Sequence, residues 1–216
     1  MKLRRMPQAL IYDLDGVLLD TEPFYTQVTQ EIVAEYGKTF DWSIKSNMIG
    51  RPSLESARYL VEALDLPIAP EEYLARRGAR LEKLFRDSRP RPGAERFTTE
   101  MSRRGAVQGV ATSSEKRLFD IKTSRHRAWF ALFDAVVTGD DPRVRRGKPA
   151  PDIFLRAAED LRVEPRSCVV FEDAPSGVEA ALAAGMQVVA LPDPAMDRSR
   201  YRDATWIVES FDGVSP

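Results

Sequence analysis

Six short apolar runs, each bounded by polar or turn residues, constrain what this chain of 216 residues can fold into. Such runs are typical of buried β-strands, and apolar residues at helical spacing, such as Ile153, Ala157 and Leu161, lie between most of them. Because strands that alternate with helices form parallel sheets, the sequence predicts an α/β fold with a doubly wound parallel sheet. The runs are Ala9–Tyr12, Val107–Ala111, Ala135–Val137, Cys168–Phe171, Val188–Leu191 and Trp206–Val208.

The stretch from Pro23 to Phe85 interrupts this alternation with helical patterns and no strand-like run. Two prolines and a glycine in the segment 86–93 would stop a helix and stiffen the return to the sheet, so we expect a hinge there. We therefore predict a core of residues 1–19 and 88–216 and a helical cap of residues 20–87. The apolar positions at helical spacing are Phe24, Val28, Ile32 and Tyr36, then Leu54, Ala57, Leu60, Val61 and Leu64, then Leu74, Leu81, Leu84 and Phe85.

The charge composition argues against nucleic-acid and membrane partners. Lys and Arg number 32 against 33 Asp and Glu, so the chain lacks the positive field that holds phosphate backbones. No apolar stretch approaches the roughly 18 residues of a membrane span, and the apolar run after the basic start Met1–Met6 meets Asp13 too early for a signal peptide.

The single cysteine, Cys168, rules out an intrachain disulfide framework. We expect a cytoplasmic protein and a monomer.

Acidic pairs follow two of the predicted strands. Asp13 and Asp15 would point the same way from an extended chain, and like charges so close together need a cation. Carboxylates at a sheet edge suit Mg²⁺ better than zinc, because Mg²⁺ prefers oxygen ligands. Glu172 and Asp173 follow another strand in the same way. Taken alone, the first pair is more often a solvated turn before a glycine, and Asp173 is a turn residue or a helix cap.

Two further clusters could bind phosphate. Thr112 and Ser113 end a predicted strand just before a helix, where hydroxyl and backbone N–H groups could receive a phosphate. Lys148, held between a glycine and a proline, could neutralise it. Taken alone, Thr112 and Ser113 are typical of a helix cap, and Lys148 is typical of a charged residue in a solvated loop. In an open parallel sheet, however, ligands bind at the carboxyl ends of strands, so the combination of clusters predicts a site for phosphoryl transfer.

The acidic, hydroxyl and lysine clusters together resemble the four motifs of the haloacid dehalogenase (HAD) superfamily. They stand in the expected order as Asp13–Glu22, Thr112, Gly147–Pro149 and Phe171–Gly177, and the match covers nearly the whole chain. The helical insertion resembles the small cap of the β-phosphoglucomutase-like branch. The resemblance implies a Rossmann-like HAD core with a helical cap inserted after the first strand.

Within that branch, three further segments resemble the pseudouridine-5'-phosphatase family: Phe119–His126, Gly139–Pro142 and Ala180–Val189. The resemblance implies a Mg²⁺-dependent phosphomonoesterase that acts on a small phosphorylated metabolite. Pseudouridine 5'-phosphate and a sugar phosphate are the two substrates that we keep open.

The resemblance also implies a role for each clustered side chain. Asp13 would be the nucleophile that forms an aspartyl-phosphate, and Asp15 would be the general acid and then the general base. The Asp13 carboxylate, the Asp15 backbone carbonyl and the Asp173 carboxylate would hold Mg²⁺, with Glu172 beside them or as an occasional ligand. The transferring phosphoryl oxygens would be bound by Thr112, Ser113 and Lys148.

Three alternatives stay open at this point. A phosphomutase of the same branch carries a histidine after the first motif and an arginine in the cap, where this chain has Tyr25 and Ser53, although Arg51 lies close by. A dehalogenase is disfavoured because Lys148 and the acidic pair favour phosphate. A non-catalytic module that binds a phosphorylated ligand should have lost a motif acid, and none is missing here.

Overall fold

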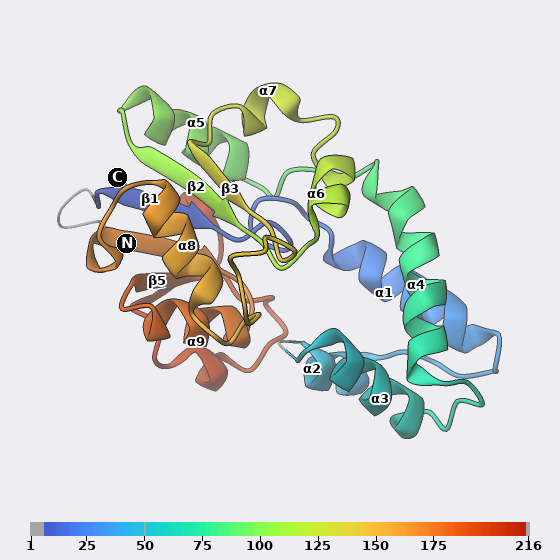
Figure 1. Cartoon of the computed structure of the whole chain (residues 1–216). Coiled ribbons are helices and arrows are strands. Elements are labelled where there is room, and N and C mark those ends of the chain that lie inside the picture. Colours follow the sequence, from blue (N-terminus) through green and yellow to red (C-terminus); the bar gives the residue numbers. More distant parts are fainter. Residues whose placement is uncertain (1–6, 50, 215–216) are drawn as a thin grey trace.

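The computed structural model describes residues 7–49 and 51–214, so the basic start Met1–Met6 lies outside the described residues. Within the described residues, a six-stranded parallel sheet has the strand order β3-β2-β1-β4-β5-β6 (Figure 1). The chain starts at the centre, moves to one edge and then crosses to the other, which confirms the predicted doubly wound sheet. The strands are β1 (Ala9–Tyr12), β2 (Val107–Ala111), β3 (Ala135–Val137), β4 (Cys168–Glu172), β5 (Gln187–Ala190) and β6 (Trp206–Ile207).

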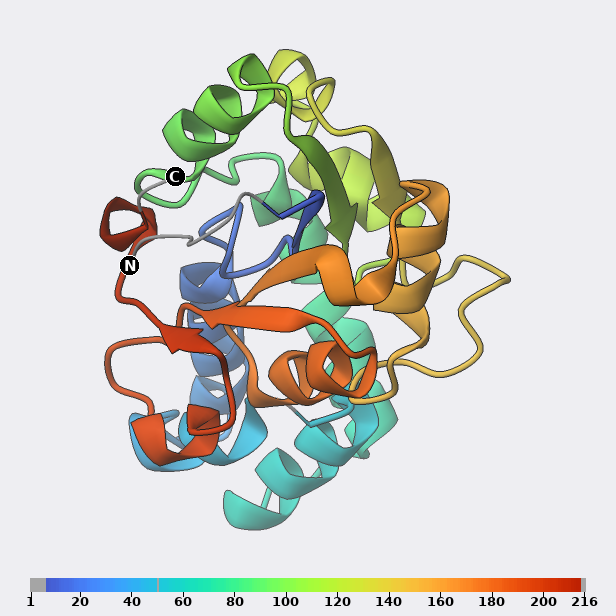
Figure 2. The ribbon, with the colours of Figure 1, turned by 90° about the vertical axis from the view of Figure 1, so that its left-hand side faces the viewer.

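Alternate residues of the central strands enter two apolar layers. Every residue of β1 is buried, and Leu10 and Tyr12 pack into one layer while Ala9 and Ile11 pack into the other. Burial of both faces explains why these strands are continuous apolar runs. Helices cover both faces (Figure 2). The first layer includes α5 (Ala94–Arg103), α6 (Lys116–Lys122) and α7 (Arg127–Phe130), and the second includes α8 (Asp152–Asp160) and α9 (Pro175–Ala183).

Short 3-10 helices complete the described part of the chain at Pro165–Ser167, Arg198–Tyr201 and Phe211–Gly213. None of the helices in the described ranges is both long enough and apolar enough to cross a membrane.

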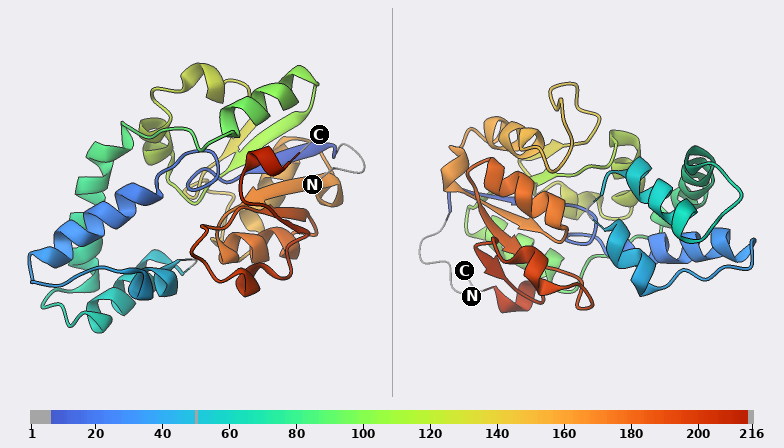
Figure 3. Two further views of the ribbon diagram at one scale, coloured as in Figure 1. Left: turned by 180° about the vertical axis from the view of Figure 1, so that it is seen from behind. Right: turned by 90° about the horizontal axis from the view of Figure 1, so that it is seen from below.

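In the described part of the chain, four helices between β1 and α5 form a separate group, which we call the helical unit (Figure 3). It has its own apolar cluster, and the hydroxyls of Thr29 and Tyr73 share a hydrogen bond of 2.9 Å inside it. One of its helices has no buried residue and begins at Asp41, whose side chain accepts hydrogen bonds from two backbone N–H groups; the apolar spacing does not predict this helix. The helices are α1 (Glu22–Ala34), α2 (Trp42–Met48), α3 (Ser53–Ala63) and α4 (Pro70–Phe85).

Two chain segments join the helical unit to the core and run side by side. The N–H of Asp20 donates to the carbonyl of Arg89, and the N–H of Arg91 donates to the carbonyl of Leu18, both at 2.8 Å. The returning segment lies in the region where the sequence predicts a hinge. The cap boundaries at 19/20 and 87/88 stay a prediction.

Candidate active site

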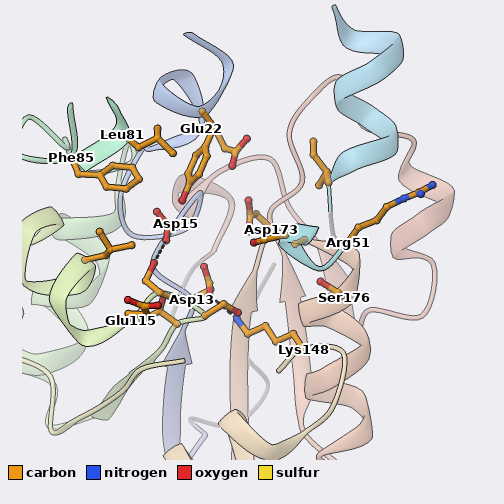
Figure 4. A pocket seen from close by; sticks show the side chains of 18 of the residues that line it. Asp13, Asp15, Glu22, Arg51, Leu81, Phe85, Glu115, Lys148, Asp173 and Ser176 are labelled. Carbon is orange, nitrogen blue, oxygen red and sulfur yellow. Dashed lines mark hydrogen bonds and ion pairs between the residues drawn. The ribbon is translucent and has the colours of Figure 1, made fainter. Parts of the chain in front are cut away.

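The carboxyl ends of β1, β2 and β4 face the helical unit across a pocket of about 480 Å³ (Figure 4). Leu81 and Phe85 of α4 line it from the opposite side. The strand order reverses between β1 and β4, which is where ligands bind in open α/β sheets. All of the site residues predicted from the sequence line this pocket: Asp13, Asp15, Thr112, Ser113, Lys148, Glu172 and Asp173.

Lys148 links two acids of the pocket. Its ammonium donates to Asp13 Oδ1 at 2.5 Å and to Glu172 Oε1 at 2.6 Å. Burial raises the pKa of Asp13 to about 7, because the attraction of Lys148 does not offset the loss of water and the charges of Glu172 and Asp15. Burial would lower the pKa of Lys148, but the two carboxylates raise it above its usual value. Two acids therefore share one ammonium.

Glu172 is fixed by contacts on both of its oxygens. Besides the bond from Lys148, its Oε2 accepts from the N–H of Ala174 at 3.0 Å, and the residue is almost completely buried. Gly177 leaves the room for this, since a Cβ there would lie 1.8 Å from Glu172 Oε1. Glu172 thus holds Lys148 in place beneath Asp13.

The Asp173 carboxylate adds a negative charge without a partner. It makes no hydrogen bond or ion pair with any other residue in the ranges that the structure describes. Burial, followed by the charges of Glu172 and Asp13, raises the pKa of Asp173 well above its usual value. Gly16, at φ 76°, allows this approach, because a Cβ there would lie 2.0 Å from Asp173 Oδ2.

Asp15 lies in a different environment, at the other side of the same pocket. Its Oδ1 accepts from Thr21 Oγ1 at 2.6 Å and from Lys122 Nζ at 2.7 Å, and its Oδ2 accepts from Ser114 Oγ at 2.9 Å and again from Lys122 at 2.7 Å. Burial would raise the pKa of Asp15, but Lys122 and the two hydroxyls lower it. The pKa values of the two aspartates are therefore shifted in opposite directions, because Asp15 has more hydrogen-bond donors around its carboxylate than Asp13 has.

The carboxylates of the two aspartates have different partners. The N–H of Asp13 still donates to the carbonyl of Phe171 in β4, and Gly16 follows the two acids with a positive φ of 76°. Each carboxylate has its own ammonium, Lys148 for one and Lys122 for the other.

Lys122 is the site residue that sequence reasoning missed, together with the hydroxyls of Thr21 and Ser114. Its side chain is 0% exposed and lies on the buried face of α6, three residues after Phe119. The sequence offered two signals, a lysine at an apolar position of a short helix and its place in the segment Phe119–His126 that carries the family resemblance. Its ammonium also lies 4.2 Å from the centre of the Phe85 ring of the helical unit.

The loop after β2 presents hydrogen-bond donors to the pocket. The N–H of Thr112 continues the sheet by donating to the carbonyl of Val137 at 3.0 Å, and the Thr112 hydroxyl accepts from the N–H of Ser114 at 3.1 Å. The Ser113 N–H donates to no other residue in the described ranges. The loop can therefore offer this N–H and nearby hydroxyls to an anion.

The acids of the pocket fit a small divalent cation. The charges of Glu172 and Asp13 raise the pKa of Asp173, and the pairing of Asp13 with Lys148 does not prevent this, so a cation beside Asp13 and Asp173 would relieve the repulsion. Among the described residues, no three His, Cys, Asp or Glu side chains are grouped as metal ligands. Asp13 and Asp173 both line the pocket, and Mg²⁺ is commonly bound by one or two carboxylates and several waters.

The family model of haloacid dehalogenase-like hydrolases matches residues 7–185, and the chain belongs to this family. The (DL)-glycerol-3-phosphatase 1, mitochondrial, of Arabidopsis thaliana is 45% identical over 212 residues, which cover 96% of this chain and 71% of that protein. The Drosophila melanogaster protein named probable pseudouridine-5'-phosphatase is 41% identical over 218 residues, which cover 100% of this chain and 94% of its own length. With these relatives, the chain is a phosphatase of the family.

Solved structures agree with this assignment. A HAD family hydrolase from Deinococcus radiodurans, solved with bound phosphate and sodium, has a TM-score of 0.77 at 26% identity, and the match covers 97% of this chain and 94% of that one. The β-phosphoglucomutase of Clostridium difficile has a TM-score of 0.75 at 22% identity over 96% and 93% of the two chains, which shows a shared fold. The predicted family resemblance is thus confirmed.

Proposed function

We propose that the chain is a Mg²⁺-dependent phosphomonoesterase that hydrolyses a small phosphorylated metabolite through an aspartyl-phosphate on Asp13. The observation that carries this proposal is the contrast between two neighbouring acids. Asp13 shares the Lys148 ammonium with Glu172 and lies in one pocket with the unpartnered Asp173, whereas Asp15 accepts hydrogen bonds from Lys122 and from two hydroxyls. Asp13 and Asp173 could receive a cation and a phosphate, and the hydroxyl bonds of Asp15 can give way to a leaving group or to water.

The reaction would proceed in two steps. An Asp13 oxygen attacks phosphorus, the bond from phosphorus to the leaving oxygen breaks, and Asp15 in its acid form gives that oxygen a proton. Water then attacks the same phosphorus, Asp15 takes the proton from water, and the Asp13 carboxylate is released with inorganic phosphate. The proton balance returns Asp15 to its starting form after each turnover.

The Asp13 carboxylate, the Asp15 carbonyl and the Asp173 carboxylate would hold Mg²⁺, with Glu172 beside them. When bound, the cation supplies the positive charge that lets an anionic nucleophile approach an anionic phosphate. Thr112, the Ser113 N–H and Lys148 would bind the phosphoryl oxygens, whose charge spreads in the transition state.

The helical unit would act as the cap, residues 20–87, over a core of residues 1–19 and 88–216. Tyr25, Leu81 and Phe85 give the pocket an apolar side, and Arg51 and Arg77 give it positive charge. Such a lining supports a compact alcohol bearing one phosphate, and the relatives named for glycerol 3-phosphate and pseudouridine 5'-phosphate supply the two substrates to compare. Closure over them would exclude water.

The test is phosphate release from glycerol 3-phosphate, pseudouridine 5'-phosphate, UMP and hexose phosphates, with and without Mg²⁺. Asp13→Asn is the blank, and Asp212→Asn, an exposed acid outside the pocket, is the matched control. We expect Mg²⁺-dependent release that Asp13→Asn abolishes and Asp212→Asn leaves intact. Release that survives Asp13→Asn, or no release from any substrate, would overturn the proposal.

The same assay separates the alternatives. A phosphomutase would convert a sugar monophosphate to an isomer in the presence of a bisphosphate, and a binding module would release nothing. Ser53 lines the pocket where the mutases carry an arginine, which supports hydrolysis, but Arg51 lines the same pocket and could take that arginine's place, so the two reactions are separated by their products. The cytoplasmic location and the monomeric state stay predictions, and one relative carries the word mitochondrial in its name.

A further inference from the structure

Lys122 is a buried charge to which the proposed reaction assigns no step. Its side chain is 0% exposed, yet it donates to both oxygens of Asp15 at 2.7 Å and to Ser114 Oγ at 2.8 Å. Burying an ammonium is costly unless it is paired and hydrogen bonded, so the contacts must be strong enough to hold it there. Among the described residues, it is the only cation that forms an ion pair with Asp15.

The contacts of Asp15 differ in what they can do during proton transfer. Its two oxygens accept four hydrogen bonds, two of them from the hydroxyls of Thr21 and Ser114 and two from Lys122. A hydroxyl can turn from donor to acceptor, so either hydroxyl bond can give way to substrate or water. An ammonium only donates. When one Asp15 oxygen takes up the proton, Lys122 can still donate to the other oxygen, so its contact can persist while the proton is exchanged.

Packing from the helical unit fixes the ammonium in turn. The Phe85 ring of α4 lies 4.2 Å from Lys122 Nζ, and the Tyr25 ring of α1 lies 5.9 Å away. An ammonium over the face of an aromatic ring is attracted by its quadrupole. Lys122 thus lies between a core carboxylate and two rings of the helical unit.

We propose that Lys122 is a positioning residue for Asp15: its ammonium holds the carboxylate in the orientation from which Asp15 protonates the leaving oxygen. The inference rests on the proposed function, because it assigns Asp15 the role of general acid. A lysine that only stabilised the fold would change the amount of folded enzyme and would affect all substrates alike.

Leaving groups of different basicity separate these two roles. An alkyl phosphate needs its leaving oxygen protonated, whereas the leaving group of p-nitrophenyl phosphate departs with little help. We expect Lys122→Met to lower kcat/KM about 100-fold for the best alkyl phosphate of the panel and less than about tenfold for p-nitrophenyl phosphate. The loss should lie in kcat, with KM changed less than about threefold. Lys116→Met, an exposed lysine of the same helix, is the matched control and should behave as wild type.

An equal loss for both phosphates, a loss confined to KM, or unchanged kinetics would overturn the inference. If Lys122→Met does not fold, as judged by circular dichroism, Ser114→Ala removes a hydroxyl that contacts both Lys122 and Asp15 without leaving a buried charge. Ser114→Ala should also lower kcat/KM more for the alkyl phosphate than for p-nitrophenyl phosphate, by a smaller factor than Lys122→Met. Equal losses of kcat/KM for the two phosphates in this variant would also overturn the inference. Failure of the proposed function is distinct, because wild type itself would then release no phosphate.

Discussion

In metal-free protein, Asp13→Asn should make the fold more stable while it abolishes phosphatase activity. Burial raises the pKa of Asp13 from 3.8 to about 7, with further repulsion from Glu172 and Asp15. The folded chain therefore binds this proton more tightly than the unfolded chain. The contribution of the Asp13 carboxyl to the stability of the fold is therefore greatest below pH 3.8 and is lost as the pH rises to about 7. An asparagine has almost the same shape and does not ionise, so it escapes this loss.

The size of the effect follows from the two pKa values. Each pH unit between them is worth about 1.4 kcal/mol. At about pH 5 this carboxyl is ionised in the unfolded chain but not in the folded one, which lowers the free energy of unfolding by about 1.6 kcal/mol from its value at low pH. At about pH 8 the whole difference between the pKa values of 3.8 and about 7 counts, and the loss amounts to about 4 kcal/mol. For a chain of this length, about 4 kcal/mol corresponds to a rise in Tm of roughly 8–16 °C.

Thermal unfolding followed by circular dichroism, in EDTA and at both pH values, measures this difference. Asp15→Asn is the matched control, since Lys122 and two hydroxyls lower the pKa of Asp15 against the effect of burial. It should lower Tm, because it leaves Lys122 buried without its carboxylate. The reasoning is refuted if Asp13→Asn is no more stable than wild type at about pH 8, or if its gain is the same at both pH values.

Three further predictions follow from the same contacts. Lys148→Met should lower kcat/KM at least about 100-fold and lower the free energy of unfolding of the metal-free protein by about 3–5 kcal/mol, because Asp13 and Glu172 lose their ammonium. A variant that is as stable as wild type in urea unfolding and as active in the kinetic assay would contradict this. Gly16→Ala should weaken activation by Mg²⁺, because its Cβ would lie 2.0 Å from Asp173 Oδ2; a Mg²⁺ titration identical to that of wild type would count against it. EDTA should stop phosphate release and Mg²⁺ should restore it, and Mg²⁺ should raise the Tm of wild type more than that of Asp13→Asn; release unaffected by EDTA would speak against the metal.

The sheet and the gathering of the pocket residues could be predicted because both depend on local pattern. An apolar run that is buried on both faces reads as a strand, and β1 begins and ends at the predicted residues Ala9 and Tyr12. The carboxyl ends of parallel strands lie at one edge, so polar residues that follow β1, β2 and β4, such as Asp13, Thr112 and Asp173, meet in one pocket.

Lys122 could not be predicted, because its burial depends on contacts between distant segments. It lies 107 positions from Asp15 in the sequence, and its ammonium also packs against the Phe85 ring of the helical unit. A lysine on a short helix is normally solvated, so composition and spacing favour the surface. The separate environments of Asp13 and Asp15 could not be predicted either, since they depend on two lysines that lie 135 and 107 positions away in the sequence.

The central claim is that the phosphoryl group passes through Asp13, and trapping that species tests it most directly. Asp15→Asn, which lacks the proposed base, should be mixed with Mg²⁺ and p-nitrophenyl phosphate, whose leaving group needs little protonation, then quenched in acid within one turnover, digested and analysed by mass spectrometry. We predict one phosphoryl adduct on the peptide that contains Asp13, absent from the Asp13→Asn variant. A phosphoryl group on another residue, or phosphate release with no adduct at any time, would contradict the account.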